Sequence, residues 1–338
     1  MKKIIALIIT IATLTLLFSS CGNSAGKNEE VTKIRVGYMS GPTGMGMAKL
    51  IHDNGGIDGN DKYTFTKYAD TTTAKADLAA GKVDIICLPT NDAAAYYNTK
   101  GKNIEILAIN CLNSLYLLTD KNTTVTSFEE LNGKTVYTCK NGTPPAVLKY
   151  LLEANGIDAT VSHTYNDKEI VKPEDIAALF AADSLLSGKN PPPIVVMPEP
   201  MVTSALLAIQ KNGNPEIAYS VDLDLADAWA LVEDTPITMG CVVAGKTFIE
   251  KNEDKLDDFL NEYKASVAYI GNEENLETAA NYVVETKVMN AAPAAKKALM
   301  NLGDAISYID GDDMKSALEA FLVAINIALP DDGFYYGE

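Results

Sequence analysis

Residues 34–46, Ile-Arg-Val-Gly-Tyr-Met-Ser-Gly-Pro-Thr-Gly-Met-Gly, place a short apolar run directly before a glycine-rich loop. The run predicts a buried strand, and the helical pattern of residues 45–54 follows the loop. A loop between a strand and a helix gathers free backbone N–H groups at the positive end of the helix dipole. It therefore supplies our first candidate ligand-binding residues, with a tight turn that binds nothing as the alternative: Tyr38, Ser40, Gly41, Pro42, Thr43, Gly44 and Met45.

The same loop does not match the motifs that bind nucleotides. Met47 and Ala48 stand where a Walker A loop needs Lys and Ser or Thr after Gly46. Lys49 stands where a dinucleotide fingerprint needs its third glycine. We therefore expect no nucleotide cofactor.

Apolar strand-like runs alternate with helical patterns along the chain; the predicted strands include 34–39, 63–68 and a buried run at 194–197 that prolines bracket. This order predicts mostly parallel sheets with helices on both faces. The alternation restarts after 115–119, which predicts a second lobe. Residues 237–244 predict one more extended segment, and only helical stripes follow, one of them running from Leu299 to Ile309. Amphipathic helices without strands must bury their apolar faces against another part of the protein, and we expect this tail to pack on the first lobe.

Three more loops stand where a predicted strand ends and a helix begins, the place where open α/β sheets bind ligands. Thr143 is the expected N-cap of the helix that starts at Pro144. Glu199 either accepts hydrogen bonds from a ligand or only favours the helix N-terminus. Pure helix capping is the alternative throughout. The candidate residues of these loops are Pro89, Thr90, Asn91, Asn141, Gly142, Thr143, Pro144, Glu199 and Pro200.

The N-terminus predicts export. Lys2 and Lys3 precede an apolar run that is short for a membrane span, and Ser19-Ser20-Cys21-Gly22 follows it. We expect residues 1–20 to be a cleaved signal peptide and 21–32 a flexible tether. Ordinary secretion, with a chance cysteine at the cut, is the alternative to lipidation of Cys21.

The net charge of the chain argues against nucleic acid and anionic lipid surfaces as binding partners. The formal charge is −17, and loss of the two signal lysines makes it −19. So acidic a chain is repelled by nucleic acid and by anionic lipid surfaces, so we expect neither as a partner.

The sequence contains no recognisable metal or catalytic motif. His52 and His163 are the only histidines, and neither stands at metal-ligand spacing. GxSxG, HExxH and a paired histidine for a triad are all missing, so we predict no metal and no catalytic residues.

Four further cysteines lie among strand-like residues and predict buried thiols: Cys87, Cys111, Cys139 and Cys241. Cys111 and Cys241 are the pair to test for a disulfide. Six aromatic residues lie near predicted strand ends or segments between the lobes: Tyr38, Tyr96, Tyr97, Tyr116, Tyr137 and Trp229. A flat ligand could stack on them there, but ordinary core packing explains most of them equally well.

Four motifs occur in order along most of the mature chain: 34–38 with 41–44, Ala-Gly-Lys-Val-Asp-Ile at 80–85, Leu-Asn-Gly-Lys-Thr-Val at 131–136 and Pro-Glu-Pro at 198–200. This series resembles the nitrate/sulfonate/taurine group of bacterial ABC-importer substrate-binding proteins, which also contains binders of thiamin-pyrimidine precursors. Residues 18–22 resemble a lipoprotein box, although Phe18 stands where leucine is usual.

The resemblance implies an α/β type II periplasmic-binding-protein fold, with two lobes, a ligand cleft and two interlobe crossings near 115–119 and 238–243. The expected lobes are 33–118 plus 244–338 and 119–243. It further implies a monomeric lipoprotein, anchored outside the membrane through Cys21, that delivers a small-molecule solute to an ABC permease and ATPase.

Basic residues are absent from all four candidate loops, which slightly favours a neutral or heterocyclic ligand over bare nitrate or sulfonate. An enzyme on the same fold, of the menaquinone-pathway or pyrimidine-synthase type, is the main alternative, but those enzymes are intracellular and the synthases carry a cysteine-rich run that is missing here. A ligand sensor without transport is the third possibility.

Overall fold

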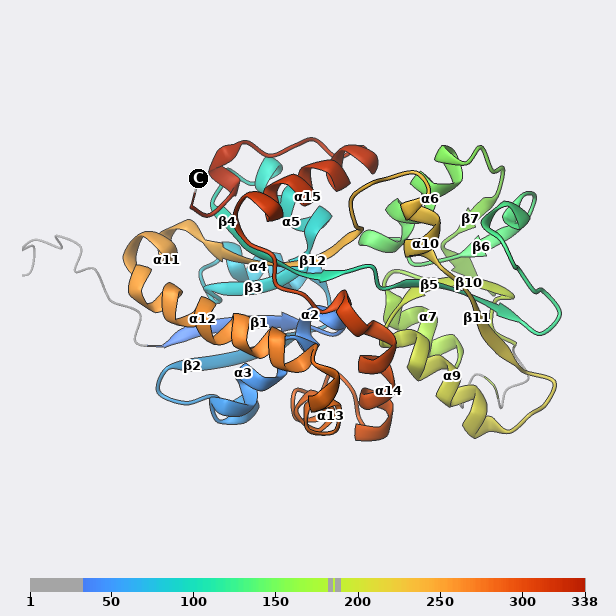
Figure 1. The fold of residues 1–338 in the computed structure, drawn as a ribbon, viewed down its shortest axis with the longest axis horizontal. Helices are drawn as coiled ribbons and strands as arrows, with labels where there is room; N and C mark the ends of the chain where they lie inside the picture. Colours follow the sequence, from blue (N-terminus) through green and yellow to red (C-terminus); the bar gives the residue numbers. More distant parts are fainter. Residues whose placement is uncertain (1–32, 182–184, 186–189, 338) are drawn as a thin grey trace, which may run out of the picture. The chain divides into compact units, whose positions relative to one another are not determined.

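Two five-stranded sheets with helices packed against them organise the part of the chain that the structure describes (Figure 1). The structure is a computed structural model, and it describes residues 33–181, 185 and 190–337. The predicted signal peptide, tether and lipidation site at Cys21 lie outside these residues. Within them, no helix is both long and apolar enough to cross a bilayer.

The first sheet has the order β2-β1-β3-β12-β4. Its central strand β3 is buried at all but its last residue, as the apolar sequence predicts for a strand covered on both faces. The strands are β1 (Ile34–Met39), β2 (Tyr63–Tyr68), β3 (Ile85–Pro89), β4 (Ile104–Leu112) and β12 (Thr238–Gly245).

The helices that follow these strands are α2 (Pro42–Met45), α3 (Ala48–Asp53), α4 (Thr71–Ala79) and α5 (Thr90–Thr99). The single helix predicted over 45–54 is wrong, because a turn at Gly46 and Met47 separates α2 from α3. A short 3-10 helix, Gly56–Asp58, precedes β2.

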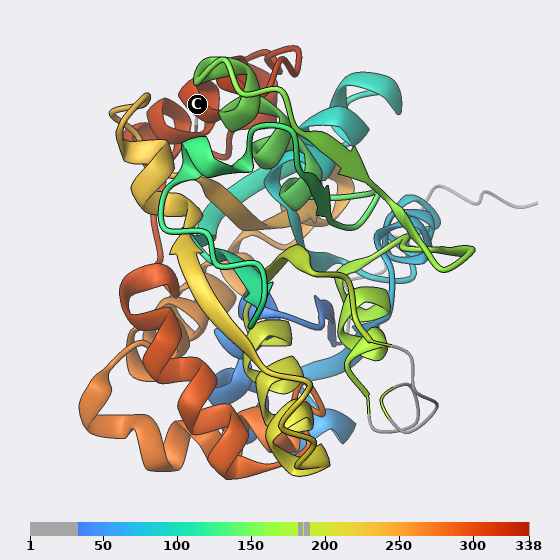
Figure 2. The same ribbon diagram turned by 90° about the vertical axis from the view of Figure 1, so that its right-hand side faces the viewer.

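The second sheet has the order β11-β5-β10-β6-β7, and Figure 2 brings its edge strand β11 into view. Its strands are β5 (Leu115–Asp120), β6 (Thr135–Tyr137), β7 (Thr160–Ser162), β10 (Ile194–Pro198) and β11 (Tyr219–Asp224), and β8 (Thr164–Tyr165) pairs with β9 (Lys168–Glu169). Its helices are α6 (Thr143–Ala154), α7 (Pro173–Leu179), α9 (Met201–Asn212) and α10 (Leu225–Ala230), and residues 128–131 form a 3-10 helix.

Both sheets are mixed, so the expectation of mostly parallel sheets was wrong. In the first sheet β12 runs antiparallel to both β3 and β4. In the second sheet β5 runs antiparallel to both β10 and β11. The remaining pairs are parallel. The reversed strand in each sheet is the one that enters directly from the other sheet, so it runs against its neighbours.

The chain changes sheet twice, after β4 and before β12. The first change falls between Leu112 and Leu115, and the second between α10 and Thr238. Both lie a few residues before the lobe bounds expected from sequence, 118/119 and 243/244. By strand pairing, residues 115–118 belong with the second sheet and 238–243 with the first.

The tail is helical and packs mainly on the first sheet and its helices. It consists of α11 (Lys246–Lys251), α12 (Glu253–Ile270), α13 (Leu276–Glu285), α14 (Ala292–Leu302) and α15 (Gly311–Ala324), with 3-10 turns at 273–275, 303–305 and 332–334. The helical stripe predicted from Leu299 to Ile309 is interrupted, because Gly303, at φ 47°, ends α14. Ile309 instead pairs with Ile109 of β4.

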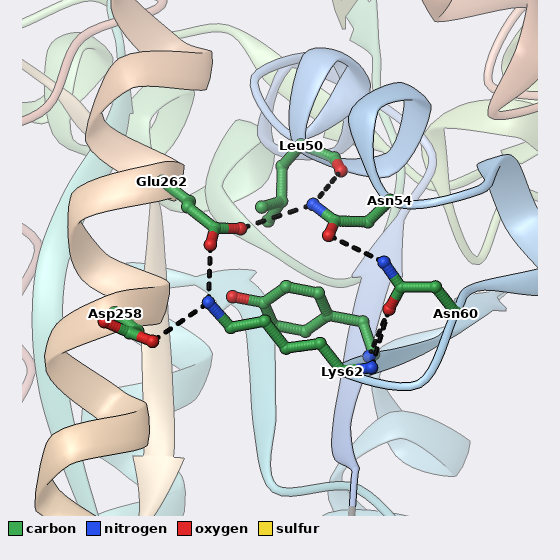
Figure 3. Close-up of polar contacts among 7 residues, drawn as sticks. Leu50, Asn54, Asn60, Lys62, Asp258 and Glu262 are labelled. Carbon is green, nitrogen blue, oxygen red and sulfur yellow. Dashed lines mark hydrogen bonds and ion pairs between the residues drawn. The ribbon is translucent and has the colours of Figure 1, made fainter.

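Polar contacts fasten the long tail helix α12 to the loop before β2 (Figure 3). Lys62 Nζ lies 3.1 Å from Asp258 Oδ2 and 2.5 Å from Glu262 Oε1. Asn54 Nδ2 donates to Glu262 Oε2 at 3.3 Å, and Asn60 Nδ2 donates to Asn54 Oδ1 at 2.9 Å. These contacts hold residues some 200 positions apart in sequence in one lobe.

Candidate functional site

A cavity of about 290 Å³ lies where the carboxyl ends of strands from the two sheets face each other. The ends of β1 and β3 contribute from the first sheet, and the end of β10 contributes from the second. Open α/β sheets bind ligands at such ends. The candidate loops named from sequence contribute Ser40, Gly41, Pro42, Thr43, Pro89, Asn141, Gly142, Thr143, Pro144 and Glu199 to its lining.

Three candidates of the first loop do not line the cavity. Tyr38 is buried, and its hydroxyl donates to the Thr286 carbonyl at 2.9 Å; burial raises its pKa to about 12. Side chains alternate along a strand, so Tyr38 faces the tail helices while Met39 reaches the cavity. Gly44 and Met45 are buried within α2.

The remaining candidates outside the lining sit beside it. Thr90 Oγ1 donates to the Thr238 carbonyl at 2.5 Å and so fixes α5 to β12. Asn91 Oδ1 accepts a hydrogen bond from Thr143 Oγ1 at 3.0 Å, which joins the two lobes beside the cavity. Pro200 is the N-cap of α9. The N-cap of α6 is Gly142 and not Thr143 as predicted.

The glycine-rich loop rests on β12. Gly41 has φ 120°, a left-handed conformation that favours glycine. A Cβ at Gly240 would overlap the Thr43 methyl group and would lie 2.8 Å from Asn110 Oδ1. Only glycine at 240 therefore lets the loop come this close. None of the described residues hydrogen-bonds to the half-buried Thr43 hydroxyl, so this group is available to a ligand.

Glu199 lines the cavity but is held from three directions. Its Oε2 accepts from the Thr203 backbone N–H at 3.1 Å, and its Oε1 accepts from Thr203 Oγ1 at 2.9 Å and from Asn301 Nδ2 at 2.7 Å. The side chain is fully buried, and burial raises its pKa despite these donors. Glu199 therefore accepts from a backbone N–H in the first turn of α9 and also connects the second lobe to the tail helix α14.

Two segments that sequence reasoning did not select complete the cavity: residues 69–72, after β2, and residues 171–174, at the start of α7. Lys172 Nζ donates across the cavity to the Ala69 carbonyl at 3.3 Å. It is the one basic side chain among the lining residues, so basic residues are absent from the four predicted loops but not from the cavity. The rule about strand ends, applied to residues 63–68, would have found the first segment.

Acidic side chains outnumber basic ones in the lining, and the acids differ in how they are held. Asp70 caps α4, accepting from the Thr73 N–H at 2.8 Å, and these hydrogen bonds lower its pKa. Asp92 pairs with Lys75 at 2.6 Å. The Glu174 carboxylate accepts a hydrogen bond from its own backbone N–H and from no other described residue. Burial raises the pKa of Glu174, although the positive charge of Lys172 acts to lower it.

The apolar part of the lining has no aromatic ring. Met39, Met201 and Met239 contribute thioether side chains, and the other apolar residues are small or are prolines. None of the tyrosines considered as stacking platforms reaches the cavity, nor does Trp229, whose indole donates to the Thr235 carbonyl. Tyr38, Tyr96, Tyr97 and Trp229 are buried core residues, whereas Tyr116 and Tyr137 are half-buried.

The four described cysteines are all buried and free, which confirms the prediction of buried thiols. Cys111 lies opposite Gly240 and is not bonded to Cys241. Cys111 lines the cavity, and burial raises its pKa to about 12, so the group is a thiol at neutral pH. Within the described part of the chain, no group of three or more His, Cys, Asp or Glu residues is placed to hold a metal ion.

Residues 64–173 match the family model described as NMT1/THI5 like. No curated protein matches the chain in sequence. The family match runs from the second residue of β2 to the first residue of α7, and so includes most of the segments that build the cavity.

Solved structures match nearly the whole chain. An ABC transporter structure from Parabacteroides distasonis is 20% identical with a TM-score of 0.66, covering 91% of this chain and 99% of that one. The periplasmic aliphatic sulphonate binding protein SsuA from Escherichia coli is 15% identical, TM-score 0.64, covering 90% and 92%. The periplasmic nitrate-binding protein NrtA from Synechocystis PCC 6803 is 16% identical, TM-score 0.60, covering 87% and 81%. These similarities confirm the predicted two-lobe periplasmic-binding-protein fold.

Proposed function

We propose that this chain is the substrate-binding lipoprotein of an ABC importer, which captures a small organic solute between its lobes and delivers it to a permease. The cavity carries the proposal, because both lobes contribute walls to it. Lys172 forms a hydrogen bond across it, and Thr143 forms one between the lobes beside it. Binding proteins of this fold close on a ligand by hinge motion, and such contacts suit a closed state.

Binding without chemical conversion fits the lining better than catalysis does. Neither histidine lines the cavity, and within the described residues the Cys111 thiol has the Leu112 carbonyl, at 3.6 Å, and the Ser114 hydroxyl, at 3.7 Å, as its hydrogen-bonding partners, neither of which is a base. A nucleophile without a base to activate it is weak.

Capture of a solute from a metabolite extract tests this proposal. The full chain is incubated with the extract, washed, denatured and assayed by mass spectrometry for released compounds. We expect a retained compound that is identical to the one in the extract. A converted product would favour an enzyme. Undiminished solute uptake by cells that lack the protein would favour a sensor.

The lipid anchor has its own test. We expect Cys21→Ala to move the protein from the membrane fraction to the soluble fraction without changing its affinity for the solute, because lipid chains supply the anchoring energy. Membrane association that survives this substitution would contradict the anchor.

A further inference from the structure

The helix ends that face the cavity are poor sites for an anion. An anion at a helix N-terminus needs free N–H donors. In α4 the Thr73 N–H is taken by Asp70, and in α9 the Thr203 N–H is taken by Glu199. In α6 two of the first three residues are prolines, which have no N–H.

The remaining three helix starts, those of α7, α5 and α2, follow the same rule. Before α7, Asp175 Oδ2 accepts from the N–H groups of Val171 and Lys172, at 2.9 and 3.0 Å, and Pro173 follows. The first turn of α5 contains Asp92. α2 begins at Pro42, which has no N–H, and its Gly44 and Met45 N–H groups donate to the Gly41 carbonyl, each at 3.1 Å. Each of these six ends thus carries an acid or has lost donors to proline, which is the reverse of what a sulfonate or nitrate requires.

The charged side chains of the lining point to the opposite kind of ligand. Asp70, Asp92 and Glu199 are satisfied by partners in the protein, as described above. Glu174 is not, and the ammonium groups that act on it are Lys172 and Lys67. Lys172 Nζ is bound to the Ala69 carbonyl, and Lys67 Nζ donates to the Lys287 carbonyl. The half-buried Glu174 therefore lines the cavity with a carboxylate whose one hydrogen-bonding partner among the described residues is its own backbone N–H.

We infer that the cavity takes a small aliphatic amine in its ammonium form, with the ammonium group on Glu174 and the aliphatic body against the methionines and prolines. This rests on the proposed function and names its solute class. An aromatic-free lining offers no cage for a quaternary ammonium or stacking surface for a flat ring, whereas a primary ammonium donates directly to carboxylates.

A matched set of probes tests this inference by isothermal titration calorimetry on the full chain: hexylammonium, hexanamide and hexanesulfonate, which share one body and differ in head-group charge. We expect hexylammonium to bind most tightly and hexanesulfonate most weakly. Glu174→Gln should weaken hexylammonium about tenfold and leave hexanamide within about threefold, since one charge–charge contact is removed. Glu153→Gln, which changes an exposed acid of α6, is the matched control and should alter nothing.

Lys172→Gln removes the positive charge of the cavity, and so tests whether the ligand is an anion held by Lys172 and not a cation held by Glu174. The ratio of hexylammonium to hexanamide affinity should stay equal or rise, because effects on lobe closure cancel in the ratio. Hexanesulfonate as the tightest probe, with its affinity lost in Lys172→Gln, would overturn the inference and leave solute binding between the lobes standing. Failure of all three probes to bind would also overturn it, and the metabolite-capture experiment would then judge the proposed function separately. The order of affinities of the three probes for the wild-type protein tests the inference even if a variant does not fold.

Discussion

The two walls of the cavity are built differently. The first lobe presents a glycine-rich loop pressed onto β12, and its acids Asp70 and Asp92 are held within that lobe by Thr73 and Lys75. The second lobe presents Glu174 without such a partner. The difference indicates that the first wall fixes shape, whereas the second wall selects the charge of the ligand.

The largest expected effect comes from filling the space between the first wall and β12. Gly240→Val should reduce the free energy of unfolding by about 1–3 kcal/mol and abolish binding of every probe, because its side chain overlaps Thr43. Gly245→Val, at the open end of the same strand, should cost less than about 0.5 kcal/mol. Urea denaturation and calorimetry measure both. Retained binding in Gly240→Val would show that the first wall does not set the shape.

Removing the two acids of the second wall should separate support from recognition. Glu199→Ala leaves the Thr203 N–H and the Asn301 amide without an acceptor, at a cost of about 1–3 kcal/mol. Glu174→Ala should change stability by no more than about 0.5 kcal/mol. Equal losses of stability for the two variants in urea denaturation would contradict the assignment of Glu199 to structural support and of Glu174 to ligand recognition.

The Glu199 carboxyl should also make stability depend on pH. Burial raises its pKa above the unfolded value, so its stabilising contribution is complete below the unfolded pKa and is lost as the pH rises through the folded pKa. The advantage of the wild type over Glu199→Gln in unfolding free energy should therefore be greater near pH 4 than near pH 7. An advantage that grows with pH would contradict the assigned direction.

The smallest expected effect concerns the hydrogen bond that joins the walls. Thr143→Val and Asn91→Ala should each weaken hexylammonium binding by about 0.5–1.5 kcal/mol, the usual range for one hydrogen bond. The double variant should lose no more than either single one, because both remove the same contact. Additive losses in this double-mutant cycle would mean that the two side chains act independently.

Much of the fold followed from local pattern. The strands at 34–39 and 63–68 have the predicted bounds, and the proline-bracketed run at 194–197 is a buried central strand. The direction of β12 could not be predicted, because nothing in its own residues records from which sheet the chain arrives. The break at Gly46 was missed because the residues on both sides favour a helix.

The candidate site was predicted where a strand end coincides with a glycine or proline motif. Lys172 and Glu174 were missed because they follow a two-residue strand, β9, and reach the cavity only through tertiary packing. Tyr38 does not line the cavity, because it is a residue of β1 whose side chain points away from it, and nearness to the loop does not determine on which side a strand residue points.

A crystal structure of the full chain with its tightest-binding compound would show whether both walls hold the ligand. We predict that the compound lies between the lobes and contacts Thr43 from the first wall and Glu174 from the second. A compound bound elsewhere, or held by one lobe alone with the other wall turned away, would contradict it.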